Sequence, residues 1–261
     1  MSYDPPMTAE QAQQHLEQRR RESAHYVPSI AAKASSTTVE GLGVSLASVA
    51  LGKVNVPLRP SPTREQMQAE VESCRAMRAA QLLLQANVPK RQMSRVALDR
   101  SGPWQKVLDK LTAMLGTGFM VALVGSRGNG KTQLAVELIR TVVSAKSAKR
   151  ARFCTATEFF MEVKSGYRDD GKPEADVIRD FQKPSLLVID EIGQRRESEW
   201  ERLLLYELLN RRYNDMTDTL VISNQTQGQL EEALGPALIS RMSETGGVIC
   251  AEWPSYRSIT G

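Results

Sequence analysis

Residues 125–132 are Gly125-Ser126-Arg127-Gly128-Asn129-Gly130-Lys131-Thr132. They match the pattern Gly-x-x-x-x-Gly-Lys-Ser/Thr in full. Glycines lack a Cβ and let the backbone fold closely around phosphates, while the amide groups of the turn and of the following helix terminus face the anion. We expect Lys131 to reach the β- and γ-phosphates of a nucleoside triphosphate and Thr132 to ligate Mg²⁺. The stretch therefore predicts a P-loop.

Strand and helix patterns alternate around this stretch. An apolar run at residues 119–124 predicts a buried strand before the P-loop, and residues 131–143 predict an amphipathic helix after it. Further strands are expected at residues 152–155, 186–189, 220–223 and 248–251, and further helices at residues 157–164, 199–213, 227–234 and 236–242. Strands that alternate with helices form parallel sheets covered on both faces. The sequence thus predicts an α/β fold with a parallel five-stranded sheet sandwiched by helices.

A pair of carboxylates follows the expected third strand. The apolar run 186–189 is followed directly by Asp190 and Glu191, and ligands bind at the carboxyl ends of strands in open α/β sheets. We expect Asp190 to join Thr132 in the Mg²⁺ shell, and Glu191 to orient and deprotonate an attacking water. Asn224, after the fourth strand, is expected either to sense the γ-phosphate or to be an ordinary turn residue. These features predict hydrolysis of a nucleoside triphosphate.

Composition and charge exclude several classes of protein. Of the 261 residues 41% are hydrophobic and 25% are charged, which is enough for a packed core. The net charge of +4 is uneven, since residues 1–110 hold 15 basic and 10 acidic residues whereas the rest is close to neutral. No signal peptide or membrane span is recognisable, and Cys74, Cys154 and Cys250 lack the spacing of a zinc site or disulfide framework. We therefore expect a protein of the reducing cytoplasm without a membrane partner.

The front of the chain differs from the back. Residues 8–22 predict a polar helix, and residues 28–62 are rich in Ser, Ala, Gly and Pro, as is typical of a linker. A stronger helix is expected over residues 63–86, where apolar residues recur at three- and four-residue steps, namely Met67, Val71, Cys74, Met77, Ala80 and Leu84. Residues 73–98 contain five basic residues and no acidic one, namely Arg75, Arg78, Lys90, Arg91 and Arg95. They form either a solvated helix face or a contact for nucleic-acid phosphates.

We therefore expect three parts in the chain. Residues 1–62 form a partly flexible N-terminal region with helical content, residues 63–103 a helical basic connector, and residues 104–261 the α/β domain. Only twenty residues follow Arg241, so no full helical lid domain is expected behind the sheet.

The back of the chain contains six motifs, namely GSRGNGKT, LLVIDEIG, NRRYND, VISNQT, LISRM and EWPSYRS. In order and spacing these motifs resemble those of bacterial DnaC-type replicative helicase loaders. The resemblance covers residues 70–261 and implies an AAA+ P-loop ATPase that uses ATP and Mg²⁺. It implies a hexameric DnaB-type replicative helicase and single-stranded DNA as partners, with the N-terminal region binding the helicase. It also implies self-association and slow, assembly-dependent hydrolysis of ATP to ADP and phosphate.

The resemblance implies further site residues. Asn224 falls on the first sensor, Arg241 on the arginine finger that reaches a neighbouring subunit's nucleotide, and Arg257 on the second-sensor arginine. The residues alone leave Arg241 open as a surface arginine that stabilises a helix carboxyl terminus. By resemblance, the residues that contact single-stranded DNA are Lys164, Tyr167, Ser198 and Trp200. The alternatives are a helix-capping role for Ser198 and core packing for Trp200.

Three functions remain open at this point. The first is an ATP-dependent loader that places a hexameric replicative helicase on single-stranded DNA, with hydrolysis that responds to the DNA. The second is an IstB-type transposition helper, a related ATPase that binds duplex DNA and a transposase. The third is a non-catalytic module that occupies a helicase without loading it, which the intact Lys131, Asp190 and Glu191 disfavour. The loader is the preferred prediction.

Overall fold

The computed structural model describes residues 62–94, 102–166, 171–194 and 198–255. The chain divides into two units, residues 1–63 and residues 64–261, and the fold below is that of the second unit. The helix expected over residues 8–22 and nearly all of the expected linker lie outside the described residues. No helix in the described ranges is both long enough and apolar enough to cross a lipid bilayer.

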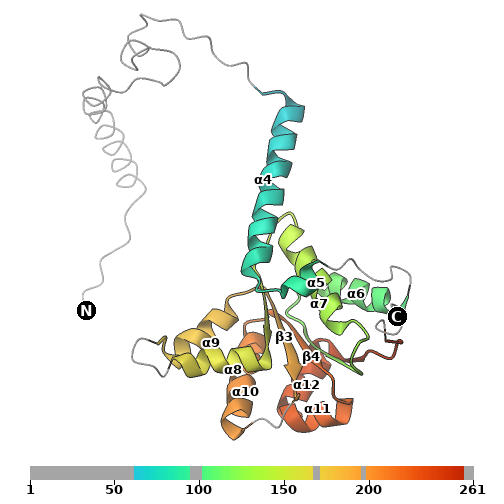
Figure 1. Ribbon diagram of the computed structural model, residues 1–261, viewed down its shortest axis with the longest axis vertical. Helices are drawn as coiled ribbons and strands as arrows, with labels where there is room; N and C mark the ends of the chain where they lie inside the picture. Colours follow the sequence, from blue (N-terminus) through green and yellow to red (C-terminus); the bar gives the residue numbers. More distant parts are fainter. Residues whose placement is uncertain (1–61, 95–101, 167–170, 195–197, 256–261) are drawn as a thin grey trace, which may run out of the picture. The chain divides into compact units, whose positions relative to one another are not determined.

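A parallel sheet of five strands lies at the centre of this unit (Figure 1). The strands are β1 (Met120–Val124), β2 (Ala151–Thr155), β3 (Leu186–Ile192), β4 (Asp218–Ser223) and β5 (Gly247–Cys250). Their order across the sheet is β2-β3-β4-β1-β5, and every neighbouring pair is parallel. The predicted α/β fold is therefore confirmed. Because the strands run the same way, their carboxyl ends meet at one edge of the sheet, which we call the carboxyl edge.

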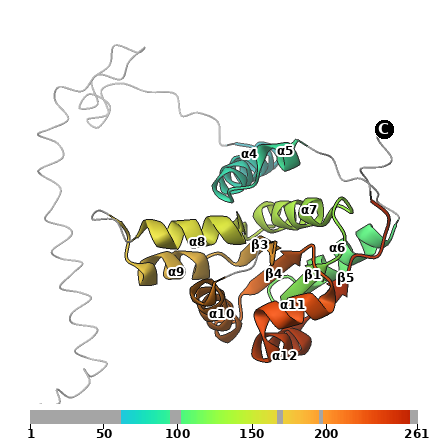
Figure 2. The ribbon, with the colours of Figure 1, turned by 60° about the horizontal axis from the view of Figure 1, so that its bottom comes forward.

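Helices cover both faces of the sheet, and each face has its own apolar layer. Successive residues of β1 point to opposite faces, so Val121 and Leu123 join one layer while Ala122 and Val124 join the other. The first layer is covered by α4 (Arg64–Gln85), α5 (Lys90–Met93), α6 (Pro103–Met114) and α7 (Lys131–Ser144). The second is covered by α8 (Ala156–Ser165), α9 (Glu174–Gln182), α10 (Glu199–Asn214), α11 (Gln227–Leu234) and α12 (Pro236–Thr245). Figure 2 shows α4 and α7 above the sheet and α10, α11 and α12 below it.

Three helices, α5, α6 and α9, have no counterpart among the predicted elements. α9 follows a charged loop, yet Val177, Ile178 and Phe181 are spaced to form one buried face. α6 begins at Pro103, a residue favoured in the first turn of a helix. α5 is a single turn and α9 has nine residues, so their apolar pattern repeats too few times to identify them from the sequence. The prediction missed α6 although its apolar residues Val107, Leu108 and Leu111 have helical spacing.

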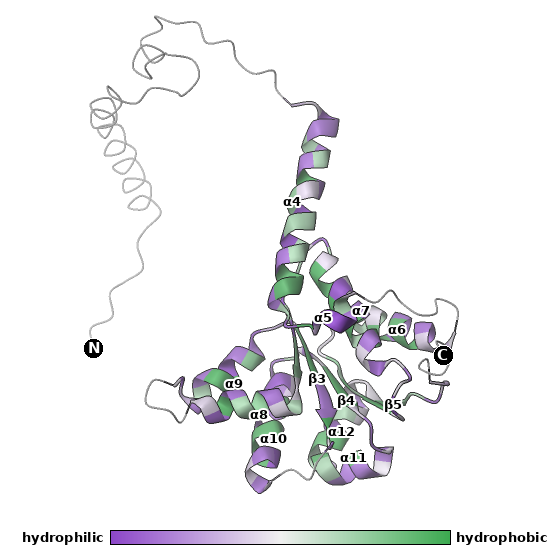
Figure 3. Ribbon diagram, viewed as in Figure 1, coloured by the Kyte–Doolittle hydropathy of each residue, from purple (hydrophilic) through white to green (hydrophobic). Residues whose placement is uncertain are grey.

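The apolar stripe of α4 is largely exposed, although the helix itself confirms the prediction over residues 63–86. Four of its apolar residues are between 48% and 74% exposed, namely Met67, Val71, Met77 and Leu84. Leu82 is the buried residue of this helix, and the amide of Phe153 in β2 donates to the carbonyl of Ala86 at 2.7 Å. Figure 3 shows hydrophilic and hydrophobic residues alternating along α4. The carboxyl end of α4 is therefore the part that anchors it to the sheet.

Two charged residues stabilise the opposite, amino edge of the sheet. Arg212 of α10 is fully buried and donates to five oxygen atoms, which lie just before β3 and at the start of β4. Burial lowers the pKa of Arg212 to about 10. Asp218 accepts hydrogen bonds from the amides of Gly116, Gly118 and Phe119. Arg212 thus joins the start of β4 to the segment before β3, and Asp218 joins it to the start of β1. Arg212 lies in the motif NRRYND, whereas no sequence pattern marked Asp218.

Candidate nucleotide-binding site

The P-loop connects β1 to α7 at the carboxyl edge. Gly125 has a φ of 141° and Gly130 a φ of 79°, values that residues with a Cβ rarely adopt. A Cβ on Gly125 would lie 2.8 Å from the carbonyl oxygen of Ala251. Gly128 also has a positive φ, and Ser126 and Arg127 are exposed on the loop. The glycines are thus required by the course of the backbone and by its close approach to the segment after β5.

Lys131 lies inside the P-loop. Its residue is only 4% exposed, and its Nζ donates to the carbonyls of Gly125 and Ser126 at 2.7 Å and to Oδ1 of Asn129 at 3.1 Å. Burial lowers the pKa of Lys131 to about 8, and the charge of Asp190 acts in the opposite direction. Phosphate oxygens are stronger acceptors than carbonyls. The ammonium can therefore exchange its contacts within the loop for contacts with a polyphosphate.

Thr132 and Asp190 meet beside the P-loop. Oγ1 of Thr132 donates to Oδ2 of Asp190 at 2.7 Å, and the amide of Glu191 donates to Oδ1 at 2.7 Å. Burial raises the pKa of Asp190, and the two hydrogen bonds oppose that shift. Mg²⁺ prefers oxygen ligands and takes one or two from the protein when phosphates and waters supply the others. The hydroxyl and the carboxylate together therefore fit Mg²⁺.

Glu191 lies at an irregularity in β3. The register between β3 and β4 shifts between Ile189 and Ile192, and Glu191 adopts a left-handed φ of 64°. This conformation costs a residue other than glycine about 1 kcal/mol, and strain of this kind gathers at functional sites. The strand extends to Ile192 rather than ending at Ile189 as predicted. The two carboxylates thus lie at an irregularity near the end of the strand, with the strain at Glu191.

Asn224 follows β4, which lies between β3 and β1 in the sheet. Ser223, the last residue of β4, pairs with Val124 of β1 on one side and with Ile192 of β3 on the other. Asn224 is half-buried. The sheet order therefore brings the predicted sensor between the P-loop and the carboxylate pair.

Two tryptophans brace the P-loop, and the sequence patterns did not single them out. Nε1 of Trp104 in α6 donates to the carbonyl of Gly130 at 3.1 Å, and Nε1 of Trp253 after β5 donates to the carbonyl of Asn129. The fully buried side chain of Asn129 accepts from Lys131 and donates to the carbonyl of Ala251 at 2.7 Å. The position of Trp253 in the motif EWPSYRS was the one available signal. The P-loop is therefore held by elements from both ends of the domain.

Arg241 packs against its own chain, on α12. Its guanidinium lies 5.9 Å from the ring centroid of Tyr206 and 5.4 Å from that of Tyr213, both on α10. One turn further on, Oγ1 of Thr245 accepts from the amide of Met120, the first residue of β1. Arg241 thus lies towards the amino ends of the strands, away from its own P-loop. Arg257 lies outside the described residues.

Three of the four expected DNA contacts come together beside α10. Nζ of Lys164 lies 5.1 Å from the ring centroid of Trp200 and 3.4 Å from Oε1 of Glu201. Ser198 and Glu201 form the reciprocal capping box of α10, and Trp200 is half-buried against the second apolar layer. The structural roles considered for Ser198 and Trp200 are therefore present. Tyr167 lies outside the described residues.

Several known proteins are similar to this chain. A family model described as IstB-like ATP binding protein matches residues 64–258. The replicative helicase loader DnaC of Escherichia coli strain K12 is 28% identical over 139 residues, which are 52% of this chain and 56% of the relative. The uncharacterized protein YdaV of the same strain is 28% identical over 137 residues, 52% of this chain and 54% of the relative. The chain thus spans about half the length of these curated relatives.

Solved structures share the fold. A crystal structure of the DnaC helicase loader has a TM-score of 0.51 at 22% identity and covers 64% of this chain and 97% of that chain. A putative primosome component from Streptococcus pyogenes serotype M3 has a TM-score of 0.53 at 16% identity and covers 68% of this chain and 98% of that chain. These likenesses confirm the predicted α/β fold. Since the family model matches well over half of its length, the chain belongs to the family of IstB-like ATP binding proteins.

Proposed function

We propose that this chain is an ATP-dependent loader that places a hexameric replicative helicase on single-stranded DNA in the cytoplasm. The cluster of Lys131, Thr132, Asp190 and Glu191 at the carboxyl edge carries the proposal. The similarity to replicative helicase loaders supports the helicase as partner. In this proposal residues 1–62 bind the helicase, residues 63–103 connect this region to the ATPase domain, and residues 104–261 form the ATPase domain.

The residues at the carboxyl edge divide the chemistry of hydrolysis among them. The P-loop amides and Lys131 bind the phosphates of ATP. Thr132 and Asp190 hold Mg²⁺, which neutralises charge on the β- and γ-phosphates when bound. Glu191 accepts the proton of the water that attacks the γ-phosphorus, and Asn224 orients the water or the γ-phosphate. ADP and inorganic phosphate leave.

Self-association is part of the proposal. Arg241 lies away from its own P-loop, which suits a residue that reaches the nucleotide of a neighbouring subunit, and Arg257 is proposed to contact the nucleotide as the second sensor. An arginine supplied in trans stabilises charge on the transferring phosphoryl group. Hydrolysis then requires an assembled oligomer, and single-stranded DNA bound at Lys164, Tyr167, Ser198 and Trp200 promotes it.

The main experiment mixes the full-length protein with a replicative helicase and ATP, with and without single-stranded DNA. We expect a stable complex and ATP hydrolysis that rises with single-stranded DNA and disappears in Lys131→Ala. Lys106→Ala, which removes an exposed lysine of α6, is the matched control and retains full activity. Absence of a helicase complex, together with a preference for duplex DNA, would reject the loader.

The arginine finger has a separate test. Arg241→Ala should bind ATP normally but lose most ATP hydrolysis, because only the neighbour's charge stabilisation is removed. Arg211→Ala removes an arginine of α10 that is paired with Glu207 and should hydrolyse ATP normally. Hydrolysis at full rate in Arg241→Ala would show that the arginine has no role in trans.

A second candidate is a transposition helper of the IstB type. The description of the matching family model favours it, and the geometry of the carboxyl edge serves both functions equally. A helper should prefer duplex DNA and form a complex with a transposase instead of a helicase. The same binding assay, run with duplex and single-stranded DNA side by side, distinguishes the two.

A further inference from the structure

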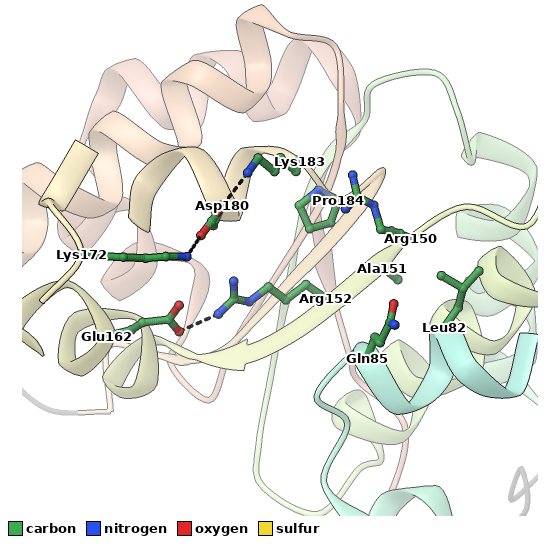
Figure 4. Close-up of a pocket in the computed structure, with 10 residues that line it drawn as sticks. All are labelled: Leu82, Gln85, Arg150, Ala151, Arg152, Glu162, Lys172, Asp180, Lys183 and Pro184. Carbon is green, nitrogen blue, oxygen red and sulfur yellow. Dashed lines mark hydrogen bonds and ion pairs between the residues drawn. The ribbon is translucent and has the colours of Figure 1, made fainter. Parts of the chain in front are cut away.

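A second charged site lies at the amino end of the edge strand β2, outside the nucleotide site (Figure 4). It is a cavity of about 390 Å³ between the carboxyl end of α4, the start of β2, α8 and α9. Its charged lining consists of four cations and two carboxylates, namely Arg150, Arg152, Lys172, Lys183, Glu162 and Asp180. We call this cavity the edge-strand pocket.

The ion pairs in the edge-strand pocket leave an excess of two positive charges. Asp180 accepts hydrogen bonds from both Lys172 and Lys183, at 2.5 and 2.6 Å, so one carboxylate serves two ammonium groups. Arg152 pairs with Glu162 at 2.6 Å. Arg150 is exposed, and no carboxylate among the described residues pairs with it. The pocket therefore holds oriented cations with charge left over for an anion.

The basic face of α4 continues this charge beyond the pocket. Leu82 and Gln85 line the pocket, and Figure 4 shows both on the side of α4 that faces β2. Arg75 and Arg78 precede Leu82 by seven and four residues, a spacing that places them on the same helix face. Both arginines are exposed, and α4 has no acidic residue after Glu72. A row of cations thus runs from α4 into the pocket.

The edge-strand pocket is separated from the nucleotide site by the length of a strand. Arg150 precedes β2, whereas Thr155 at the other end of β2 pairs with Asp190. Five residues of strand span roughly 17 Å. A ligand in the pocket therefore does not require ATP at the carboxyl edge, and the pocket is also distinct from the expected DNA contacts beside α10.

We propose that the basic face of α4 and the edge-strand pocket together bind the phosphate backbone of a nucleic-acid strand. Cations that are spread along a helix and a strand match a row of regularly spaced phosphates better than a single anion. Backbone contacts carry no sequence information. The surface binds nucleic acid without sequence preference, in the absence of nucleotide, and more weakly as salt concentration rises.

The test compares two double variants of the full-length protein. Arg78→Ala with Arg150→Ala removes one exposed cation from α4 and one from the edge-strand pocket. Arg152 is left unchanged to preserve the fold, because its Cζ lies 3.6 Å from the ring centroid of Phe181. Lys106→Ala with Lys110→Ala removes two exposed cations from α6 as the matched control. Binding of a labelled mixed-sequence single strand is measured without nucleotide over a series of salt concentrations.

We expect the affinity of the Arg78/Arg150 variant to fall by roughly tenfold per cation at moderate salt. The slope of log affinity against log salt should fall by about 1 per cation. The control should match the parent protein in both quantities. Equal affinity and slope in the two double variants would overturn the proposal.

Two competitors identify the ligand class. Inorganic phosphate, at the concentration of phosphate groups in the DNA, should leave the DNA bound, and displacement would overturn the backbone assignment in favour of a free anion. Polyglutamate of equal charge should compete more weakly than DNA, and equal competition would point to an acidic protein instead. Lys131→Ala should bind nucleic acid without nucleotide as the parent does, although it loses ATP hydrolysis. The loader proposal and the nucleic-acid proposal are therefore tested by different measurements and can fail separately.

Discussion

The carboxyl edge and the edge-strand pocket hold charged groups in opposite ways. At the carboxyl edge, burial lowers the pKa of Lys131 to about 8 and raises that of Asp190, so both charged forms are disfavoured. In the edge-strand pocket, hydrogen bonds from Lys172 and Lys183 lower the pKa of Asp180 to about 2. At the carboxyl edge, burial destabilises the charged forms of the side chains. In the edge-strand pocket, neighbouring groups of opposite charge stabilise them.

This difference follows from burial and predicts different kinds of binding. A buried charged group that is incompletely compensated destabilises the ligand-free chain and is relieved when a ligand brings opposite charge. An exposed ion pair contributes about 0–1 kcal/mol and is screened by salt. The carboxyl edge is therefore suited to specific binding of one polyphosphate, and the edge-strand pocket to weaker, salt-sensitive contacts.

The largest expected effect is that of Lys131→Ala. Loss of the buried ammonium should reduce ATP hydrolysis at least about 100-fold, because charge on the transferred phosphoryl group is no longer neutralised. Phosphate release and nucleotide binding measure the loss, and nucleic-acid binding without nucleotide should stay at the parent level. Hydrolysis near the parent rate in Lys131→Ala would contradict the assignment of the carboxyl edge as the specific polyphosphate site.

Asp190→Asn should separate stability from activity. Burial raises the pKa of Asp190, so the carboxylate costs folding energy at neutral pH and its removal should slightly stabilise the nucleotide-free chain. Hydrolysis should nevertheless fall strongly, because a ligand of Mg²⁺ is lost. Urea denaturation and phosphate release measure the two effects. A marked loss of stability would contradict the assignment of Asp190 as a charge held against desolvation.

Trp253→Phe tests the bracing of the P-loop. The ring is kept but the hydrogen bond to the carbonyl of Asn129 is lost, which should cost about 1 kcal/mol of stability and weaken ATP binding severalfold. Thermal unfolding and binding of an ATP analogue measure both effects. The matched substitution Trp200→Phe, at a tryptophan beside α8, should leave ATP binding unchanged, and equal losses in the two variants would argue against a specific brace.

The smallest expected effect is that of Asp180→Asn, the counterpart of Asp190→Asn. Loss of the ion pairs that Asp180 forms with the exposed Lys172 and Lys183 should reduce stability by at most about 1 kcal/mol, the opposite sign to Asp190→Asn. Nucleic-acid affinity should rise, because the pocket loses one negative charge and its net positive charge increases by one. Urea unfolding and the salt series measure these changes, and weaker DNA binding would contradict the proposed surface.

The same variant gives a pH dependence with a defined sign. The pKa of Asp180 is lowered from 3.8 to about 2, so its contribution to stability is complete above pH 3.8 and is lost as the pH falls towards 2. The stability difference between the parent and Asp180→Asn should therefore shrink as the pH falls through this range. A difference that does not change with pH would show that the carboxylate is unpaired in solution.

The sequence features that predicted the structure correctly are contiguous stretches of residues. The P-loop is one stretch of eight residues, and Asp190 and Glu191 directly follow the apolar residues of their own strand. Backbone propensity and apolar period act between near neighbours, so such patterns predict an element and the edge at which its side chains emerge. The short helices α5 and α9 were missed because their apolar pattern is too brief, whereas α6 was missed although its apolar residues have helical spacing.

Contacts between distant residues had no such signal. Trp104 and Trp253 lie near opposite ends of the domain, yet they donate to successive carbonyls of the P-loop. Arg212 and Asp218 stabilise the amino edge through backbone atoms, which any sequence offers. The alternative roles of Ser198 as a helix cap and Trp200 as a packed residue were both foreseen, because each depends on residues close in the chain.

By itself the sequence determined the alternation of strands and helices, the P-loop and the carboxylate pair, because these depend on residues that are adjacent in the chain. The tertiary structure alone decided that Lys131 and Asp190 are buried, that two tryptophans hold the loop, and that the basic face of α4 continues into a pocket beside β2. Burial and charge pairing arise when packing brings distant segments together, and packing also sets how far each charge is removed from water.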